Sequence, residues 1–173
     1  MRERVWLLVA MFALAEAHAE GLGLGHMPDA ETLRAADSAI GPRGMELPPG
    51  RGSVAEGAQL YAQQCAACHG ATGREGPDPV LVGGRGSLAG DKPVQTIGSF
   101  WPYATTVFDY IRRAMPFTAP GSLRDEQVYA LTAFLLAANG VVPQDKVLDR
   151  ERLAAVRMPN RDGFTPDPRP LAP

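Results

Sequence analysis

The sequence predicts an all-α domain with few helices and long connecting loops. Two stretches, Ser53–Cys65 and Ser122–Asn139, carry apolar residues at helical spacing. The 173 residues include 19 glycines and 16 prolines, which predicts that much of the chain is loop. Loops of this extent are hard to reconcile with a compact fold, so we expect something other than side chains to fill part of the core.

One pentapeptide, Cys65-Ala66-Ala67-Cys68-His69, organises the rest of the chain. The C-x-x-C-H spacing is typical of covalent haem attachment. Both thiols would bond to the haem vinyl groups as thioethers, and His69 would reach the iron. Residues three and four apart share a face of a helix, so one turn can hold the porphyrin and the iron together. The motif occurs once, which predicts a single haem c.

Two other uses of a C-x-x-C pair are a thioredoxin-like redox couple and half of a zinc site. The redox couple needs a βαβ context, which the flanks of this motif do not have. A structural zinc site needs four ligands. Only His18 and His26 remain outside the motif, and the chain has no third cysteine. The sequence therefore favours haem attachment.

The first segment, Met1–Ala19, has the features of a secretory signal peptide. It carries Arg2 and Arg4 near its start, continues with the apolar run Val5–Ala15 and ends in a small-x-small cleavage site at Ala17–Ala19. The apolar run is too short to span a bilayer, which disfavours the alternative of an uncleaved anchor. We expect cleavage after Ala19 and a periplasmic location, which agrees with haem attachment outside the cytoplasm.

The mature chain is expected to have three parts: an arm at 20–52, a domain at 53–140 and a C-terminal extension at 141–173. The arm and the extension each carry one short predicted helix, near Ala30–Ser38 and Asp145–Val156. The pattern is compatible with an arm that is disordered and with one that lies along the domain. The net charge of −2 gives no reason to expect nucleic acid or an anionic membrane as partner, and no span is predicted after the signal peptide.

The first and last helices of the domain are predicted to cross. Gly57 would let another helix approach closely, so we expect Tyr129 or Phe134 to lie near Gly57 and Tyr61. The predicted capping pairs are Ser53 with Glu56, Thr106 with Asp109, and Ser122 with Asp125. Asn139-Gly140 is predicted to end the last helix.

The glycine-rich loop that follows the motif is predicted to support His69. A carbonyl in this loop would accept a hydrogen bond from the His69 ring, which fixes the tautomer and makes the ring a better ligand. We choose Pro79 over Pro77, because Leu81 can then pack on the haem two residues later. The alternative is that either proline only forms a turn.

Met115 is the predicted sixth ligand of the iron. An iron that only transfers electrons needs such a ligand, and a thioether favours Fe(II) and raises the potential. Met115 follows a predicted helix, precedes a proline and lies far enough beyond His69 for the chain to pass around the haem. The other methionines lie in the signal peptide, the arm or the tail. The alternative is a methionine that fills the core.

The segment before Met115 is rich in aromatic residues, and most of them are expected in the core. Trp101 and Tyr103 also carry polar groups that need a partner when buried, and a haem propionate is a natural partner. A helix is expected to start near Thr105 or Thr106 and to run to about Arg113.

The haem motif, Pro79-x-Leu81 and Met115-Pro116, set between two terminal helices, resemble the class I c-type cytochromes. This resemblance implies a class I cytochrome c fold with N- and C-terminal extensions. It also implies His69 and Met115 as axial ligands.

Three further segments, Leu47–Ser53, Thr96–Phe117 and Met158–Phe164, are similar to the cytochrome c subunits of bacterial sulfite/sulfane dehydrogenases of the Sox type. This resemblance covers most of the mature chain. It implies a molybdenum-containing catalytic subunit that feeds electrons to the haem. Some cytochromes of this group carry two haem domains, whereas this chain has one.

The sequence thus predicts a periplasmic electron carrier that does no substrate chemistry by itself. We expect it to pass single electrons to a small cytochrome or an oxidase. The alternative is a ligand-binding or sensing haem protein with an open sixth iron site. Against this alternative, the sequence places no histidine, arginine or acid clearly over the iron.

Overall fold

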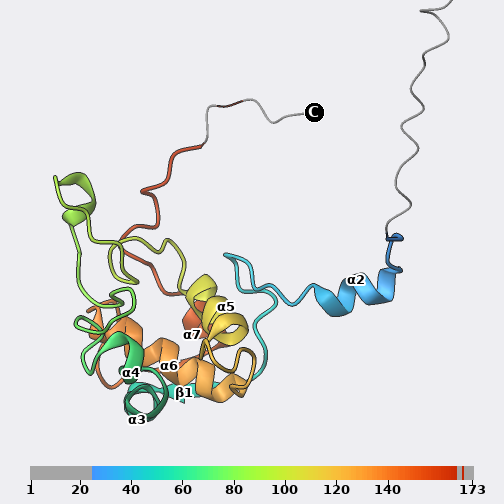
Figure 1. Ribbon diagram of the computed structural model, residues 1–173, viewed down its shortest axis with the longest axis horizontal. Helices are drawn as coiled ribbons and strands as arrows, with labels where there is room; N and C mark the ends of the chain where they lie inside the picture. Colours follow the sequence, from blue (N-terminus) through green and yellow to red (C-terminus); the bar gives the residue numbers. More distant parts are fainter. Residues whose placement is uncertain (1–24, 167–168, 170–173) are drawn as a thin grey trace, which may run out of the picture. The chain divides into compact units, whose positions relative to one another are not determined.

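The computed structural model describes residues 25–166 and residue 169 (Figure 1). Contacts divide the chain into two units, Met1–Asp37 and Ser38–Pro173. The described part of the first unit holds helix α2 (Ala30–Ala36), which begins where the Asp29 carboxylate accepts a hydrogen bond from the Thr32 N–H at 2.7 Å. The helix predicted in the arm is therefore present. The predicted signal peptide lies outside the described residues.

Helix α3 (Val54–Gln64) has the capping box that the sequence predicts. The Ser53 hydroxyl accepts from the Glu56 N–H at 3.2 Å, and the Glu56 carboxylate accepts from the Ser53 N–H at 2.8 Å. Two donors that would otherwise lack a partner at the helix start are thereby satisfied.

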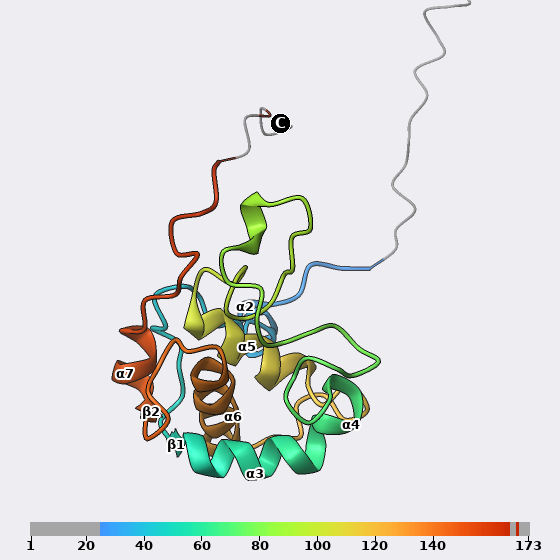
Figure 2. The same cartoon turned by 90° about the vertical axis from the view of Figure 1, so that its left-hand side faces the viewer.

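Helix α6 (Asp125–Ala138) crosses α3, as predicted (Figure 2). Gly57 makes the crossing possible, because a Cβ atom there would collide with the Ala130 carbonyl oxygen and lie 2.7 Å from Phe134 Cβ. The Phe134 ring lies 5.0 Å from the Tyr61 ring, measured between centroids. Phe134 is therefore the contact to Gly57 and Tyr61.

Helix α5 (Ala104–Ala114) has nearly the predicted bounds but not the predicted cap. The Thr106 hydroxyl donates to the Tyr103 carbonyl at 2.9 Å instead of capping an N–H. The Asp109 carboxylate accepts from the Ile40 N–H at 2.9 Å and pairs with Arg113. The predicted capping box is wrong because Asp109 is buried and binds these two partners.

The start of α6 also differs from the prediction. The helix begins at Asp125, and the Gln127 side chain accepts from the Arg124 N–H at 2.9 Å. Ser122 does not cap it, because Ser122 lies in the preceding turn, where its N–H donates to the Ala119 carbonyl at 3.3 Å. The predicted end of the helix is confirmed, since Gly140 follows it with φ +67°.

A short antiparallel sheet joins the two flanks of the domain, so the all-α prediction is correct only in outline. Strand β1 (Arg51–Ser53) pairs with β2 (Val147–Asp149), with Gly52 opposite Leu148. Helix α7 (Arg150–Ala154) follows directly. The helix predicted near Asp145–Val156 therefore begins later, because its first residues form β2.

The core of the second unit lies between α3, α5 and α6 and continues under α7. Large side chains that are almost fully buried include Leu47, Tyr61, Phe108, Tyr129, Leu148, Leu153 and Met158. The long loop from Gly70 to Tyr103 contains only a short 3₁₀ helix, η1 (Ser87–Ala89), in agreement with the prediction. Within the described part of the chain, none of the helices has the length and apolar character needed to cross a bilayer.

Candidate functional site

The haem motif forms one short helical turn, α4 (Ala66–His69), after the end of α3. The Cys65 carbonyl accepts from the Cys68 N–H at 3.2 Å and from the His69 N–H at 3.0 Å. Cys65 is half-buried against the core and Cys68 is exposed. The three side chains therefore leave a single turn, as the spacing predicts.

The His69 ring is held by the loop that follows it. Its Nδ1 atom lies 3.0 Å from the Pro79 carbonyl oxygen. A carbonyl can only accept, so Nδ1 is the protonated nitrogen and Nε2 keeps its lone pair. The hydrogen bond expected from Pro79 is present, and it leaves the histidine in the tautomer that binds a metal through Nε2.

The loop that carries Pro79 is fixed on both sides by backbone hydrogen bonds. The Asp78 N–H donates to the Cys68 carbonyl at 3.0 Å, which ties the loop to the motif. Farther on, the Leu81 and Val82 N–H groups both donate to the Gly73 carbonyl, at 2.9 and 3.1 Å. The carbonyl that orients His69 thus sits between two anchored points.

Met115 lies at the C-terminal end of α5 with extended backbone, φ −122° and ψ 149°. Its N–H donates to the Ile111 carbonyl at 3.1 Å, while its side chain is partly exposed and packs against the core. The other described methionines are fully buried (Met158) or largely exposed (Met27 and Met45).

Several apolar residues pack on the core but keep one side uncovered. They come from α3, α4, α6 and the loops between them: Leu60, Cys65, Ala66, Leu81, Trp101, Met115 and Phe134. Partly exposed apolar side chains of this kind suit contact with a flat apolar disc. Together with the exposed Cys68 thiol and the oriented His69 imidazole of the motif, these residues offer two thiols, an imidazole and a thioether, which fits a haem.

Trp101 and Tyr103 stand in the loop before α5. The Trp101 ring meets the Tyr110 ring edge-on at 5.7 Å between centroids. The Arg161 guanidinium lies 4.4 Å from the centroid of the Tyr103 ring. Sequence reasoning did not find this contact, because Arg161 belongs to the C-terminal extension.

The ionisation of the two thiols disfavours a redox couple. Burial raises the pKa of Cys65 to about 11. A hydrogen bond with Asp78, followed by burial, raises the pKa of Cys68. Reactive cysteine pairs have lowered pKa values. Among the residues that the structure describes, no group of three or more His, Cys, Asp or Glu side chains is arranged to hold a metal ion.

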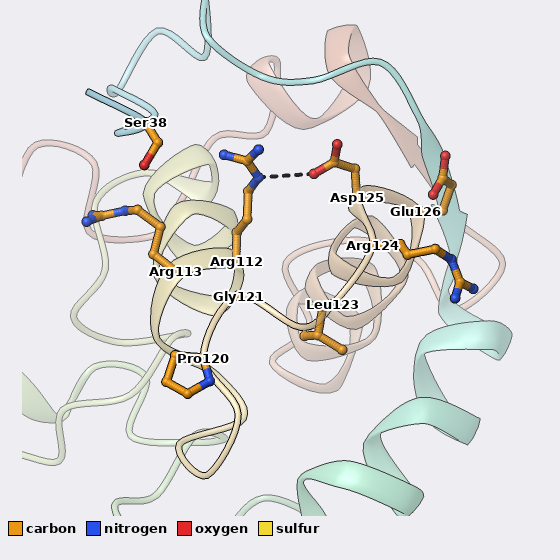
Figure 3. Close-up of a pocket in the computed structure, with 9 residues that line it drawn as sticks. All are labelled: Ser38, Arg112, Arg113, Pro120, Gly121, Leu123, Arg124, Asp125 and Glu126. Atoms are coloured by element: carbon orange, nitrogen blue, oxygen red, sulfur yellow. Dashed lines mark hydrogen bonds and ion pairs between the residues drawn. The ribbon is translucent and has the colours of Figure 1, made fainter. Parts of the chain in front are cut away.

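An open depression of about 720 Å³ lies between α5 and the start of α6 (Figure 3). Its lining is largely charged, and Arg112 forms an ion pair with Asp125 there at 3.0 Å. None of the predicted site residues lines it. Its polar lining does not suit a porphyrin.

Comparisons with known proteins agree with these features. The family described as cytochrome c oxidase, cbb3-type, subunit III matches residues 52–135. A search of curated proteins gives no match. The solved structure of the sulfane dehydrogenase SoxCD from Paracoccus pantotrophus contains a chain that is 48% identical, with a TM-score of 0.76. This match covers 85% of the present chain and 73% of the other. The chain therefore belongs to the class I c-type cytochromes, a family of electron-transfer proteins with haem c, and is close to those of the Sox type.

Proposed function

We propose that this chain is a periplasmic monohaem cytochrome c that accepts single electrons from a molybdenum-containing sulfite/sulfane dehydrogenase subunit. It then passes them to a small cytochrome or an oxidase. Transient docking suits the second step, because weak redox encounters use small interfaces.

The extent of the match with the sulfane dehydrogenase carries this proposal. The general cytochrome family matches only residues 52–135, whereas the structural match covers 85% of the chain. The larger match must therefore include sequence that flanks the haem domain. If these flanking segments had no specific role, we would not expect a chain of a particular dehydrogenase to share them.

The residues of the site divide the work between them. Cys65 and Cys68 would hold the haem covalently, and His69 and Met115 would bind its iron. The bound haem supplies one-electron chemistry between Fe(III) and Fe(II). Because His69 and Met115 would stay bound in both oxidation states, little in the chain would need to rearrange. The Pro79 carbonyl keeps the His69 ring in one orientation.

Leu81 would contact the haem in this proposal, and Trp101 and Tyr103 would be partners for its propionates. Both residues are partly exposed in the structure.

Export by residues 1–19 is the second part of the proposal. N-terminal sequencing of the protein from the periplasmic fraction should give a chain that starts at Glu20. A chain that still begins at Met1 and stays with the membrane would contradict cleavage and favour an anchor.

The decisive experiment is to isolate the tagged protein from its native periplasm under mild conditions. We expect a molybdenum protein to accompany it, and added sulfite or a sulfane donor to reduce the haem. A Cys65→Ala/Cys68→Ala variant, which cannot attach haem, is the control for the optical signal. A protein that comes out alone and stays oxidised would contradict the sulfur role.

Carbon monoxide tests the carrier role separately. With both axial positions filled, the reduced native protein should not bind it readily. Rapid binding would show an open sixth site and favour a ligand-binding or sensing protein.

A further inference from the structure

We propose that Asn139 is a positioning residue for the proximal haem ligand: from the end of α6 it holds the loop whose Pro79 carbonyl orients His69, and so it tunes the redox potential. This inference rests on the proposed function in one respect, namely that His69 binds the iron.

The Asn139 side chain joins two elements through all of its polar atoms. Its Nδ2 donates to the Leu81 carbonyl at 3.1 Å and to the Leu135 carbonyl at 2.9 Å. Its Oδ1 accepts from the Gly83 N–H at 3.0 Å. Gly98 packs directly on it, since a Cβ atom at Gly98 would lie 2.8 Å from Asn139 Cβ. One side chain thus fixes two backbone groups of the loop.

These contacts lie two and four residues beyond Pro79. Pro79 itself is exposed, so the direction of its carbonyl depends on the anchors on either side. The upstream anchor is the bond from Asp78 to Cys68. Downstream, the Leu81 N–H donates to the Gly73 carbonyl, and the Leu81 carbonyl accepts from the Asn139 side chain at 3.1 Å and from the Ile97 N–H at 3.3 Å. Among the described residues, none of the side chains of α6 itself is hydrogen-bonded to this loop, so the link depends on Asn139, the residue that directly follows the helix.

The helix does not need this side chain in order to end. The Gly140 N–H donates to the Ala137 carbonyl and the Val141 N–H donates to the Leu136 carbonyl, both at 2.9 Å. These backbone bonds and the positive φ of Gly140 terminate α6. The bonds from Asn139 to the loop are therefore an addition to the helix stop that the sequence indicates.

The physical consequence concerns the basicity of the imidazole. A carbonyl that accepts the Nδ1 proton makes Nε2 a stronger donor and stabilises the more highly charged Fe(III). A loosened loop lengthens this hydrogen bond, so the potential should rise. The Nδ1 proton should also exchange faster with solvent.

The test uses haem-loaded Asn139→Ala, with Gln144→Ala as the matched control. Gln144 Nε2 donates to the Ala137 carbonyl at 3.1 Å, so the control removes a side-chain bond at the same end of α6 without touching the loop. The readouts are the potential and the exchange rate of the His69 Nδ1 proton, followed by NMR in the Fe(II) state. Asn139→Ala should raise the potential and accelerate the exchange of the Nδ1 proton, whereas Gln144→Ala should leave both at their native values.

A second variant guards against misfolding. Asn139→Asp keeps the acceptor for Gly83 and loses the donor to Leu81, so it should shift both readouts in the same direction. Equal values for Asn139→Ala and Gln144→Ala would overturn the positioning role. If His69→Ala leaves the native haem spectrum unchanged, His69 is not a ligand, and the proposed function fails together with this inference.

Discussion

The four methionines that the structure describes differ in their surroundings. Met27 and Met45 are 87% and 68% exposed, and Met158 is 1% exposed. Among these four, Met115 is the one that is partly exposed and packs against the apolar core, as Leu81 and Trp101 also do. A thioether that packs on the core but is not enclosed by it can still bind a metal on its exposed side. This environment, more than its place in the sequence, distinguishes Met115.

Met115→Ala should lower the redox potential and open the sixth site. The thioether favours Fe(II), so its loss should shift the potential down by about 0.1 V or more, a small part of the roughly 0.8 V that axial ligands span. Spectroelectrochemistry measures the shift, and carbon monoxide binding reports the open site. Met45→Ala is the control, since that side chain is exposed. An unchanged potential in Met115→Ala would show that another residue is the ligand.

At the scale of elements, the contact between α3 and α6 could be predicted from the sequence, whereas two helix starts could not. The apolar residues of α6 recur at helical spacing and Gly57 leaves room for them, so the sequence pattern indicated the contact that the structure shows. The capping boxes predicted at Thr106 and Ser122 are absent from the structure for a different reason. Asp109 is buried and binds the Ile40 N–H and Arg113, and Ser122 is hydrogen-bonded within a turn. Local capping rules do not include such tertiary partners.

Gly57→Ala should destabilise the protein by about 1–3 kcal/mol, the usual cost of overpacking. The new methyl group would meet the Ala130 carbonyl, a backbone atom that cannot turn away. This cost should exceed the gain of roughly 1 kcal/mol in helix propensity. Urea unfolding measures the change. Gly90→Ala is the control, because a Cβ atom there has its nearest neighbour at 3.4 Å and the backbone has φ −97°. Equal stabilities would mean that the helices can separate without cost.

Because Tyr61 and Tyr129 are buried, we expect the free energy of unfolding to fall in alkali. Burial raises the pKa of Tyr61 and of Tyr129 from 10.0 to about 12. Between these values the unfolded chain has lost phenolic protons that the folded chain keeps. Their contribution to stability is therefore full below about pH 10 and is lost as the pH rises toward 12.

The unfolding free energy, measured from pH 9 to 12, should fall less steeply in Tyr129→Phe than in the native protein. Tyr129→Phe also loses the hydrogen bond to the Pro48 carbonyl, at 2.8 Å, so it should be less stable already at pH 7. The comparison therefore concerns the slope with pH and not the absolute value. Parallel pH profiles would show that Tyr129 does not contribute to the alkaline loss.

At the scale of the whole molecule, the flanks of the haem domain are part of its core. Strands β1 and β2 join them, and Arg150 Nε donates to the Leu47 carbonyl at 2.7 Å. Asn160 Nδ2 donates to the Phe100 carbonyl at 2.8 Å, next to the predicted haem contact Trp101. Strands of three residues carry no usable periodicity, so the sequence pattern could not predict this closure. The resemblance to Sox cytochromes indicated only that the flanks belong with the domain.

Met158→Ala tests whether the C-terminal extension stabilises the haem domain. Met158 is 1% exposed and belongs to the same core cluster as Leu47 and Leu153. Its truncation should leave a cavity and lower the free energy of unfolding by about 2–5 kcal/mol. Because it is not a ligand, the potential and the haem spectrum should stay native, which is the reverse of the result expected for Met115→Ala. Urea unfolding followed by both far-UV circular dichroism and haem absorbance measures the effect. If the extension folds independently of the domain, the haem absorbance of Met158→Ala will change at the same urea concentration as in the native protein. The closure seen in the structure would then contribute nothing to the stability of the haem site.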